Sequence, residues 1–205
     1  MKKVLIPVFK FEELSDEVKA SVRQKEYEFL SEMGDIAEQV KDFYSYRLQE
    51  MNYPVDDIRW SLSYCQGDGM AFYGHLDIDT LVKLRNRLMP GKGRSLPVTF
   101  FEEYIDITIT CSNNHYDHYN TMHLSMDICH DITSAKRLDA LKEFVGLIAE
   151  DMKETSKLLE REGYNLIEAM QESEYLDECI VSQDRDYYID GEILSHTYET
   201  CLECA

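Results

Sequence analysis

Two stretches of the chain, one near each end, carry hydrophobic residues at helical spacing. Over residues 12–51 the apolar positions fall three, four or seven apart, which is the period of an amphipathic helix. Ser15 precedes two acidic residues, as an N-cap does, and Gly34 with Asp35 predicts a break. We therefore expect two helices in this region, after a short strand at residues 3–9.

The second helical stretch covers residues 134–175. Its apolar residues form one stripe, which predicts a helix that ends at Gly163; the stripe consists of Leu138, Leu141, Val145, Ile148, Met152 and Leu159. A further short helix is expected over residues 165–173. The tail at residues 187–194 contains an Asp-Gly pair, which favours a turn, and we expect a small hairpin there.

Between these helical stretches the pattern changes to a period of two, which is typical of half-buried strands. Residues 58–65 alternate between apolar and polar, residues 66–69 are Gln-Gly-Asp-Gly, and a second apolar run follows. Because glycine reaches the positive φ values that tight turns need, this arrangement predicts a β-hairpin. A short helix at residues 77–89 and a loop at residues 90–97 are expected next.

A second hairpin is expected from residues 98–111 and 116–128, with its turn at residues 112–115. Isoleucines alternate with polar residues in its first arm, so one face of this hairpin is predicted to be buried. The chain therefore indicates an α+β fold, with an antiparallel sheet of about four strands packed by N-terminal and C-terminal helices. Its length suits a single domain over residues 1–205.

The balance of charge excludes whole classes of partner. The chain holds 40 acidic and 21 basic residues, for a formal net charge of −19. A protein that binds nucleic acid broadly supplies Lys and Arg to the phosphates, and a protein that binds anionic lipid needs the same residues. We therefore expect no direct broad nucleic-acid binding and no membrane association. A hydrophobic fraction of 44% indicates a folded chain rather than a charged disordered one.

The charge is also uneven along the chain. Five basic residues and no acid lie between positions 83 and 94: Lys83, Arg85, Arg87, Lys92 and Arg94. The rest of the chain then carries −24, and residues 139–205 alone carry −13. The basic segment is either a solvated helix and loop or a docking patch for an anion or a partner. The acidic surface either keeps the protein soluble or imitates DNA, with carboxylates in the place of phosphates.

Patterns for catalysis and metal binding are weak. His115, His118 and His123 lie within nine residues, but residues five apart on a strand point to opposite faces. No helical His-Glu-x-x-His pair is present, and neither is a Gly-x-Ser-x-Gly segment or a Cys/His signature of a nucleophile. The sequence therefore predicts no catalytic residue, no metal site and no cofactor.

The cysteines and the N-terminus bear on the compartment. Six scattered cysteines indicate free thiols in a reducing cytoplasm, and Cys201 with Cys204 forms one CxxC pair whose role stays open. The chain starts with basic and then apolar residues, but the apolar run is only about six residues long and no small-residue cleavage site follows. No stretch approaches the roughly 20 apolar residues of a membrane span. We expect a cytoplasmic protein.

Four segments of the chain, spread over most of its length, carry a recognisable set of motifs. They are Phe-Lys-Phe-Glu-Glu-Leu-Ser-Asp-Glu at 9–17, Ser-Leu-Ser-Tyr-Cys-Gln-Gly-Asp-Gly-Met-Ala-Phe at 61–72, His-Tyr-Asp-His-Tyr-Asn-Thr-Met at 115–122 and Tyr-Tyr-Ile-Asp-Gly-Glu at 187–192. Together they resemble a family of acidic accessory proteins encoded by bacteriophages and prophages, with a Gln-Gly-Asp-Gly hairpin motif. The resemblance implies an anti-defence or host-takeover role. It also implies that residues 66–69 and 115–121 face one another across a shared site.

Two hypotheses of different classes follow. In the first, the chain is a phage-encoded, non-enzymatic inhibitor whose acidic surface binds a host defence protein or nucleoprotein complex with a basic surface. In the second, it is a binding protein (a sponge) or a hydrolase for a nucleotide signal. The basic residues of positions 83–94 would then hold phosphates, and the pocket would be formed by Gln66, Asp68, His115 and His118. A third possibility is an assembly protein that forms a homodimer through its helices.

Overall fold

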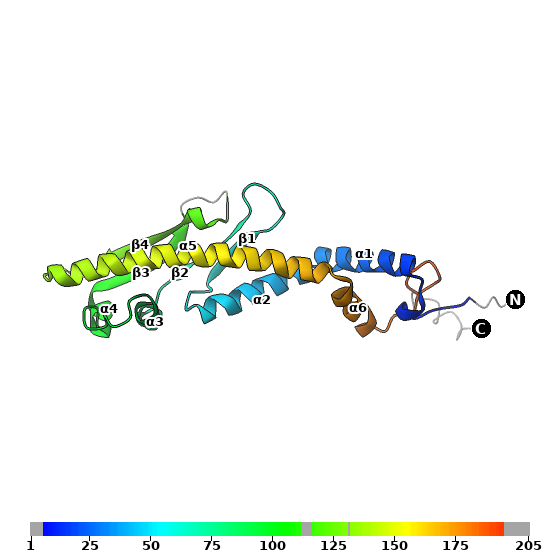
Figure 1. Ribbon diagram of the computed structural model, residues 1–205, viewed down its shortest axis with the longest axis horizontal. Coiled ribbons are helices and arrows are strands. Elements are labelled where there is room, and N and C mark those ends of the chain that lie inside the picture. Colours follow the sequence, from blue (N-terminus) through cyan, green and yellow to red (C-terminus); the bar gives the residue numbers. More distant parts are fainter. Residues whose placement is uncertain (1–5, 112–115, 131, 195–205) are drawn as a thin grey trace, which may run out of the picture. The chain divides into compact units, whose positions relative to one another are not determined.

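The computed structural model describes residues 6–111, 116–130 and 132–194 (Figure 1). The chain forms two compact units. We call Met1–Glu38 together with Leu166–Ala205 the terminal unit, because it contains both ends of the chain, and Gln39–Asn165 the central unit. The boundary between them falls inside two helices, α2 (Asp35–Glu50) and α5 (Ala135–Gln171).

The first helix of the terminal unit has the predicted ends. Helix α1 (Asp16–Met33) begins at Ser15, whose Oγ accepts a hydrogen bond from the amide of Val18 at 3.4 Å. It ends at Gly34, which has a φ of 85°, the left-handed conformation of a helix C-cap. Helix α2 starts at the next residue, so the expected N-cap and the expected break are both confirmed.

Helix α6 (Ser173–Ser182), which the sequence pattern did not predict, packs against α1. Arg23 Nε donates a hydrogen bond to the carboxylate of Asp177 at 2.5 Å across this contact. A short 3-10 turn, η1 (Phe11–Glu13), contributes Phe11 to a small hydrophobic core in this unit. The buried residues of this core are Phe11, Leu14, Val22, Ile180 and Tyr187.

The small hairpin expected at the C-terminal side is present in the terminal unit. Tyr187 pairs with Ile193, and Gly191 between them has a φ of 83°. Tyr187 also exchanges backbone hydrogen bonds with Phe9 at 2.9 Å in both directions. The expected N-terminal strand therefore contributes one bridge, at Phe9, and the part of it at residues 1–5 lies outside the described residues.

The sheet of the central unit has four antiparallel strands in the order β1-β2-β3-β4 (Figure 1). In its register Ile58 lies opposite Phe72, and Ile107 lies opposite Met126. The chain is an α+β protein with helices from both of its ends, as predicted. The strands are β1 (Asp57–Ser61), β2 (Gly69–His75), β3 (Ile105–Cys111) and β4 (Met122–Ile128).

Helix α5 runs along the sheet (Figure 1). Ser156, which lies on α5 and is fully buried, donates a hydrogen bond to the carbonyl of Met70 on β2. On β3 the isoleucines are buried, whereas Asp106 is exposed on the other face. The predicted alternation of this strand is therefore confirmed.

Two helices correct the sequence prediction. Helix α4 (Val98–Tyr104) occupies the segment expected to begin the second hairpin. Phe100 and Phe101 are adjacent and both buried, whereas neighbours on a strand would point to opposite faces. Helix α5 continues through Gly163, so the expected separate helix at residues 165–173 is wrong: these residues form the end of α5 and the start of α6.

Candidate functional site

The loop between β1 and β2 folds around the carboxylate of Asp68, which is 7% exposed. It accepts hydrogen bonds from the amides of Ser63 at 2.6 Å and Cys65 at 3.0 Å, and from the hydroxyl of Ser61 at 3.0 Å. The Cys65 Sγ and the hydroxyl of Tyr164 on α5 donate two more. Since a carboxylate has about four acceptor positions, this side chain is saturated by its own chain.

These hydrogen bonds set the charge state of Asp68. Burial by itself raises the pKa of the carboxyl, but the donors from Tyr164, Cys65 and Ser63 outweigh burial and hold the pKa well below its ordinary value. Burial and the hydrogen bond to Asp68 raise the pKa of Tyr164 to about 12. Asp68 is therefore an ionised anchor of its loop, and its acceptor atoms face the loop and α5 rather than a ligand.

Two glycines allow this loop to approach residues 116–121 closely. A Cβ on Gly67 would lie 2.7 Å from the ring of Tyr116, and a Cβ on Gly69 would lie 2.5 Å from the carbonyl oxygen of Asp117. A cleft of about 440 Å³ opens beside this contact. The structure thus brings together the two segments that the resemblance places at a shared site. The cleft is lined by Gln66, Gly67, Tyr116, His118, Asn120 and Thr121.

The cleft presents uncharged polar groups. His118 begins the 3-10 turn η2 (Tyr119–Thr121), where its Nδ1 accepts a hydrogen bond from the amide of Asn120 at 3.2 Å. In its neutral form His118 therefore carries its proton on Nε2. Among the residues that the structure describes, no Lys or Arg lines this cleft. Its amide, hydroxyl and imidazole groups suit an uncharged polar ligand better than a phosphate.

His118 is one of three histidines that lie close together in the sequence. His115 lies outside the described residues, and His123 is exposed on β4, opposite Thr110 of β3. Within residues 6–111, 116–130 and 132–194, no group of three or more His, Cys, Asp or Glu side chains is placed to hold a metal ion.

The basic segment begins in α3 (Ile78–Leu88), the short helix that the sequence predicts. Arg85 on this helix is 7% exposed. Its Nη1 donates a hydrogen bond to the carbonyl of Leu96, and its guanidinium carbon lies 5.9 Å from the centre of the Phe101 ring. Arg85 therefore holds the loop at residues 90–97 against its own helix and is not available to an external anion.

Two further cations of the segment are bound by α5. Arg87 donates two hydrogen bonds to the carboxylate of Asp151, at 2.8 and 2.7 Å, and Lys92 forms an ion pair with Glu143. Sequence reasoning missed both pairs because their acidic partners lie far along the chain. Two of the five, Lys83 and Arg94, are exposed and form no ion pair within the described part of the chain. The structure does not bring the basic residues into the cleft.

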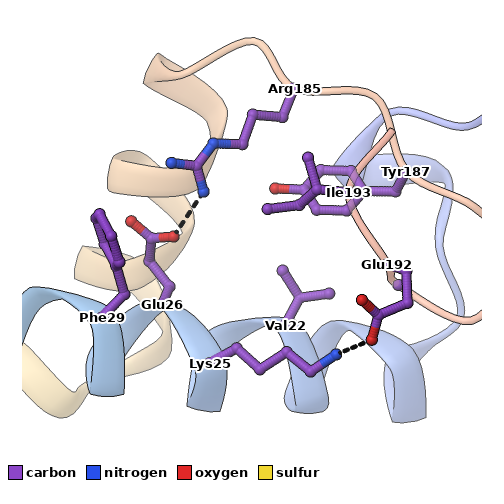
Figure 2. Close-up of a pocket in the computed structure, with 9 residues that line it drawn as sticks. Val22, Lys25, Glu26, Phe29, Arg185, Tyr187, Glu192 and Ile193 are labelled. Carbon is purple, nitrogen blue, oxygen red and sulfur yellow. Dashed lines mark hydrogen bonds and ion pairs between the residues drawn. The ribbon is translucent and has the colours of Figure 1, made fainter. Parts of the chain in front are cut away.

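A groove in the terminal unit, which the sequence pattern did not indicate, is lined by residues from both ends of the chain (Figure 2). Val22 and Tyr187 are buried in it, at 5% and 1% exposure. The apolar sides come from Phe29, which is 46% exposed, and Ile193, which is 48% exposed. The groove has a volume of about 260 Å³.

Two ion pairs flank this groove (Figure 2). Lys25 Nζ lies 2.5 Å from the carboxylate of Glu192, and Arg185 Nη1 lies 3.1 Å from that of Glu26. Glu26 is 4% exposed and also accepts a hydrogen bond from Gln183 Nε2 at 2.7 Å. Because Glu26 is held by two donors, the side of the groove formed by Arg185 is fixed in place.

The two units of the chain carry different net charges. The terminal unit holds 20 acidic and seven basic residues, a net charge of −13. The central unit, which is longer, holds 20 acidic and 14 basic residues, a net charge of −6. The acidic character of the protein is therefore concentrated in the smaller unit.

Most cations of the terminal unit are already paired with its own carboxylates. Lys10 contacts both Asp184 and Asp186 at 2.9 Å, and these pairs raise the pKa of the Lys10 ammonium. The other three pairs are Arg23–Asp177, Lys25–Glu192 and Arg185–Glu26. The exposed carboxylates that remain therefore dominate the electrostatic field around this unit.

Comparison of the chain with protein-family models, with curated proteins and with solved structures gave no match. No helix in the described part of the chain combines the length and the apolar character that a membrane crossing requires.

Proposed function

We propose that this protein is a non-enzymatic binding protein whose terminal unit captures a basic surface on a protein partner. The observation that carries the proposal is the charge of the terminal unit, −13 in the smaller of the two units. An acidic surface of this kind attracts a basic partner over several ångströms and repels nucleic acid. The proposal therefore names a protein or nucleoprotein complex as the partner.

Helices α1 and α6 supply the carboxylates for such a surface. Glu28 and Glu32 are exposed and four residues apart on α1, and Glu174 and Glu178 are exposed and four apart on α6. Residues at this spacing share a helix face and are separated by about 6 Å along its axis. Since α1 and α6 pack against each other, both pairs of carboxylates belong to one part of the terminal unit and can act together on a basic partner.

The resemblance to acidic phage and prophage proteins gives this binding a biological context. A basic surface that contacts DNA is the natural target of a protein that imitates phosphates. We therefore infer that the partner is a host defence protein or nucleoprotein complex, and that binding blocks its access to nucleic acid.

The alternative, a nucleotide-signal sponge or hydrolase, has less support. Arg85, Arg87 and Lys92 are engaged by their own chain, and no Lys or Arg among the described residues lines the cleft beside Gln66 and His118. A nucleotide would bring phosphates to a cleft that has no described cation. The polar, uncharged lining of the cleft suits a small uncharged ligand and does not support the nucleotide alternative.

Neutralising three carboxylates of the terminal unit tests the proposal. The first variant combines Glu28→Gln, Glu32→Gln and Glu178→Gln, and its probe is a fluorescent oligolysine of roughly 20 residues, measured by polarisation at low salt. At about 0.5 kcal/mol for each exposed contact, the affinity should fall roughly tenfold.

The control variant combines Glu102→Gln, Glu103→Gln and Asp127→Asn, three exposed acids of the central unit. Both variants have a net charge of −16, so a difference between them reports where the charge lies. The control is expected to bind like the unaltered protein within about twofold. Equal losses in both variants would show that net charge alone matters and would overturn the assignment to the terminal unit.

A further inference from the structure

The groove of the terminal unit leaves two large apolar side chains half in contact with water. Phe29 is 46% exposed and Ile193 is 48% exposed, whereas Val22 and Tyr187 beneath them are buried. A cavity of about 150 Å³ is enough to hold a benzene-sized group. The groove, at about 260 Å³, therefore has room for one aromatic or long aliphatic side chain.

The sides of the groove are already formed. Lys25 is paired with Glu192 at 2.5 Å, and Arg185 is paired with the buried Glu26 at 3.1 Å (Figure 2). The positive charge of both cations is therefore offset, and a basic group that approaches the groove meets no uncompensated positive charge from these two side chains. A preformed pocket also costs little conformational entropy when a ligand enters it.

The surroundings of the groove select for positive charge. Glu28 is the neighbour of Phe29 on α1, Glu32 lies one turn further, and Asp190 precedes the hairpin turn at Gly191. All three are exposed, and within the described residues none of them forms an ion pair with a cation. The groove is thus an apolar site within a unit of net charge −13.

We propose that this groove receives one large apolar side chain, aromatic or long aliphatic, from a basic segment of a protein partner. The lysines or arginines beside that side chain would contact Glu28, Glu32 and Asp190. This inference rests on the proposed function, and it adds the chemistry that makes one basic partner preferred over another. Ionic attraction alone is screened by salt and tolerates many basic sequences, whereas a buried apolar anchor discriminates among them.

Two peptide probes separate the anchor from the charge. One is a fluorescent lysine-rich peptide of roughly 12 residues with a single central Trp, and the other is the same peptide with Ser in place of Trp. Polarisation against the full chain measures both affinities. The Trp peptide is expected to bind about tenfold more tightly than the Ser peptide, and this ratio should persist when moderate salt weakens both.

Phe29→Ala and Ile193→Ala remove the sides of the groove, and each should bring the Trp-to-Ser ratio close to one. Met33→Ala is the matched control, because Met33 lies on the same helix, is 65% exposed and does not line the groove. It should leave the ratio unchanged. Circular dichroism and thermal melting of each variant establish that the fold is retained before its affinities are compared.

The outcomes distinguish the two proposals. If both peptides bind equally well to the unaltered protein and binding is salt-dependent, the groove is not the anchor site and acidic capture stands. If the Trp peptide binds more tightly but Phe29→Ala and Ile193→Ala keep the full ratio, the anchor lies elsewhere and the groove assignment is overturned. If neither peptide binds even at low salt, acidic capture fails together with the groove.

Discussion

The carboxylate of Asp68 organises the loop between β1 and β2 and links that loop to α5. Ser63 and Cys65 of the loop donate to it through their amides, Ser61 donates its hydroxyl from the end of β1, and the Tyr164 hydroxyl donates from α5. A buried acceptor that loses its charge leaves these donors less well satisfied, and such losses cost more than the hydrogen bonds contribute on average. The stability of this region therefore depends on one ionised group.

Asp68→Asn is expected to destabilise the protein by about 1–3 kcal/mol at neutral pH, because the amide keeps the shape of the carboxylate but loses its charge and one acceptor. Urea unfolding of the variant and of the unaltered protein measures the difference. Glu103→Gln, at an exposed site, is the control and should change the free energy of unfolding by less than about 0.5 kcal/mol.

The same contact predicts a dependence on pH. The pKa of Asp68 is lower in the folded chain than in the unfolded one, so its stabilising effect is complete above the ordinary carboxyl pKa of about 4 and is lost as the pH falls below it. The difference between the unaltered protein and Asp68→Asn should therefore shrink steadily on acidification below about pH 4. A difference that stays constant over that range would show that Asp68 is not held as an anion.

Sequence reasoning identified Asp68 and its glycine neighbours but not their role. The Gln-Gly-Asp-Gly segment predicts a turn, and the sequence makes Asp68 a candidate pocket residue. The donors from Ser61 and Tyr164 come from β1 and α5, so the saturation of the carboxylate depends on the tertiary fold. The need for glycine at position 69 is likewise visible only in the structure, because a Cβ there would clash with the carbonyl oxygen of Asp117.

At the scale of elements, α5 contains two glycines in very different surroundings. A Cβ added at Gly146 would meet no atom within 4 Å, whereas one at Gly163 would lie 1.9 Å from the hydroxyl oxygen of Tyr44 and 2.8 Å from Leu62 Cδ1. Tyr44 is fully buried on α2, so it has little room to move away. The absence of a side chain at Gly163 therefore lets α2 and α5 come together in the central unit.

Gly146→Ala and Gly163→Ala should change stability in opposite directions. Alanine at position 146 should stabilise the helix by up to about 1 kcal/mol, the difference in helix propensity. Alanine at position 163 should destabilise the protein by about 1–3 kcal/mol, because the overpacking outweighs the gain in propensity. Thermal unfolding of both variants provides the comparison, and stabilisation by both substitutions would contradict the close packing of Tyr44.

The basic segment offers a second test at this scale. Arg85→Met keeps most of the side-chain volume but removes the hydrogen bond to the Leu96 carbonyl, and should cost about 1–3 kcal/mol of unfolding free energy. Lys83→Met, at an exposed position of the same helix, should change it by less than about 0.5 kcal/mol. Equal effects in urea titrations would mean that Arg85 does not anchor the loop at residues 90–97.

The elements that the sequence predicts well are those with strong local signals. Ser15, Gly34 and Asp77 mark helix ends by their own chemistry, and the structure uses all three as caps. The sequence does not predict helix α4, because its Val, Thr and aromatic residues favour a strand. The helical conformation is consistent with the burial of both Phe100 and Phe101, which depends on the tertiary fold. The sequence predicts a helix end at Gly163 because the residue that requires this glycine, Tyr44, is distant in sequence.

At the scale of the whole molecule, most of the net negative charge lies in the terminal unit. The sequence shows −13 over residues 139–205, but that window includes much of α5 from the central unit. The terminal unit reaches the same −13 by combining residues from both ends. Residues 166–205 alone contribute −10 of this charge, so the sequence already shows most of it. The groove between Phe29 and Ile193, in contrast, depends on the association of both ends of the chain.

The central claim is that the acidic terminal unit competes with DNA for a basic protein surface. The most direct measurement is a competition in which the unlabelled protein is titrated into a complex of fluorescent duplex DNA and oligolysine, at low and at moderate salt. We predict release of the DNA at low salt, and an affinity for the oligolysine that falls at least about tenfold between roughly 50 and 200 mM salt. Failure to release the DNA at any salt concentration, or release that salt does not weaken, would contradict the claim.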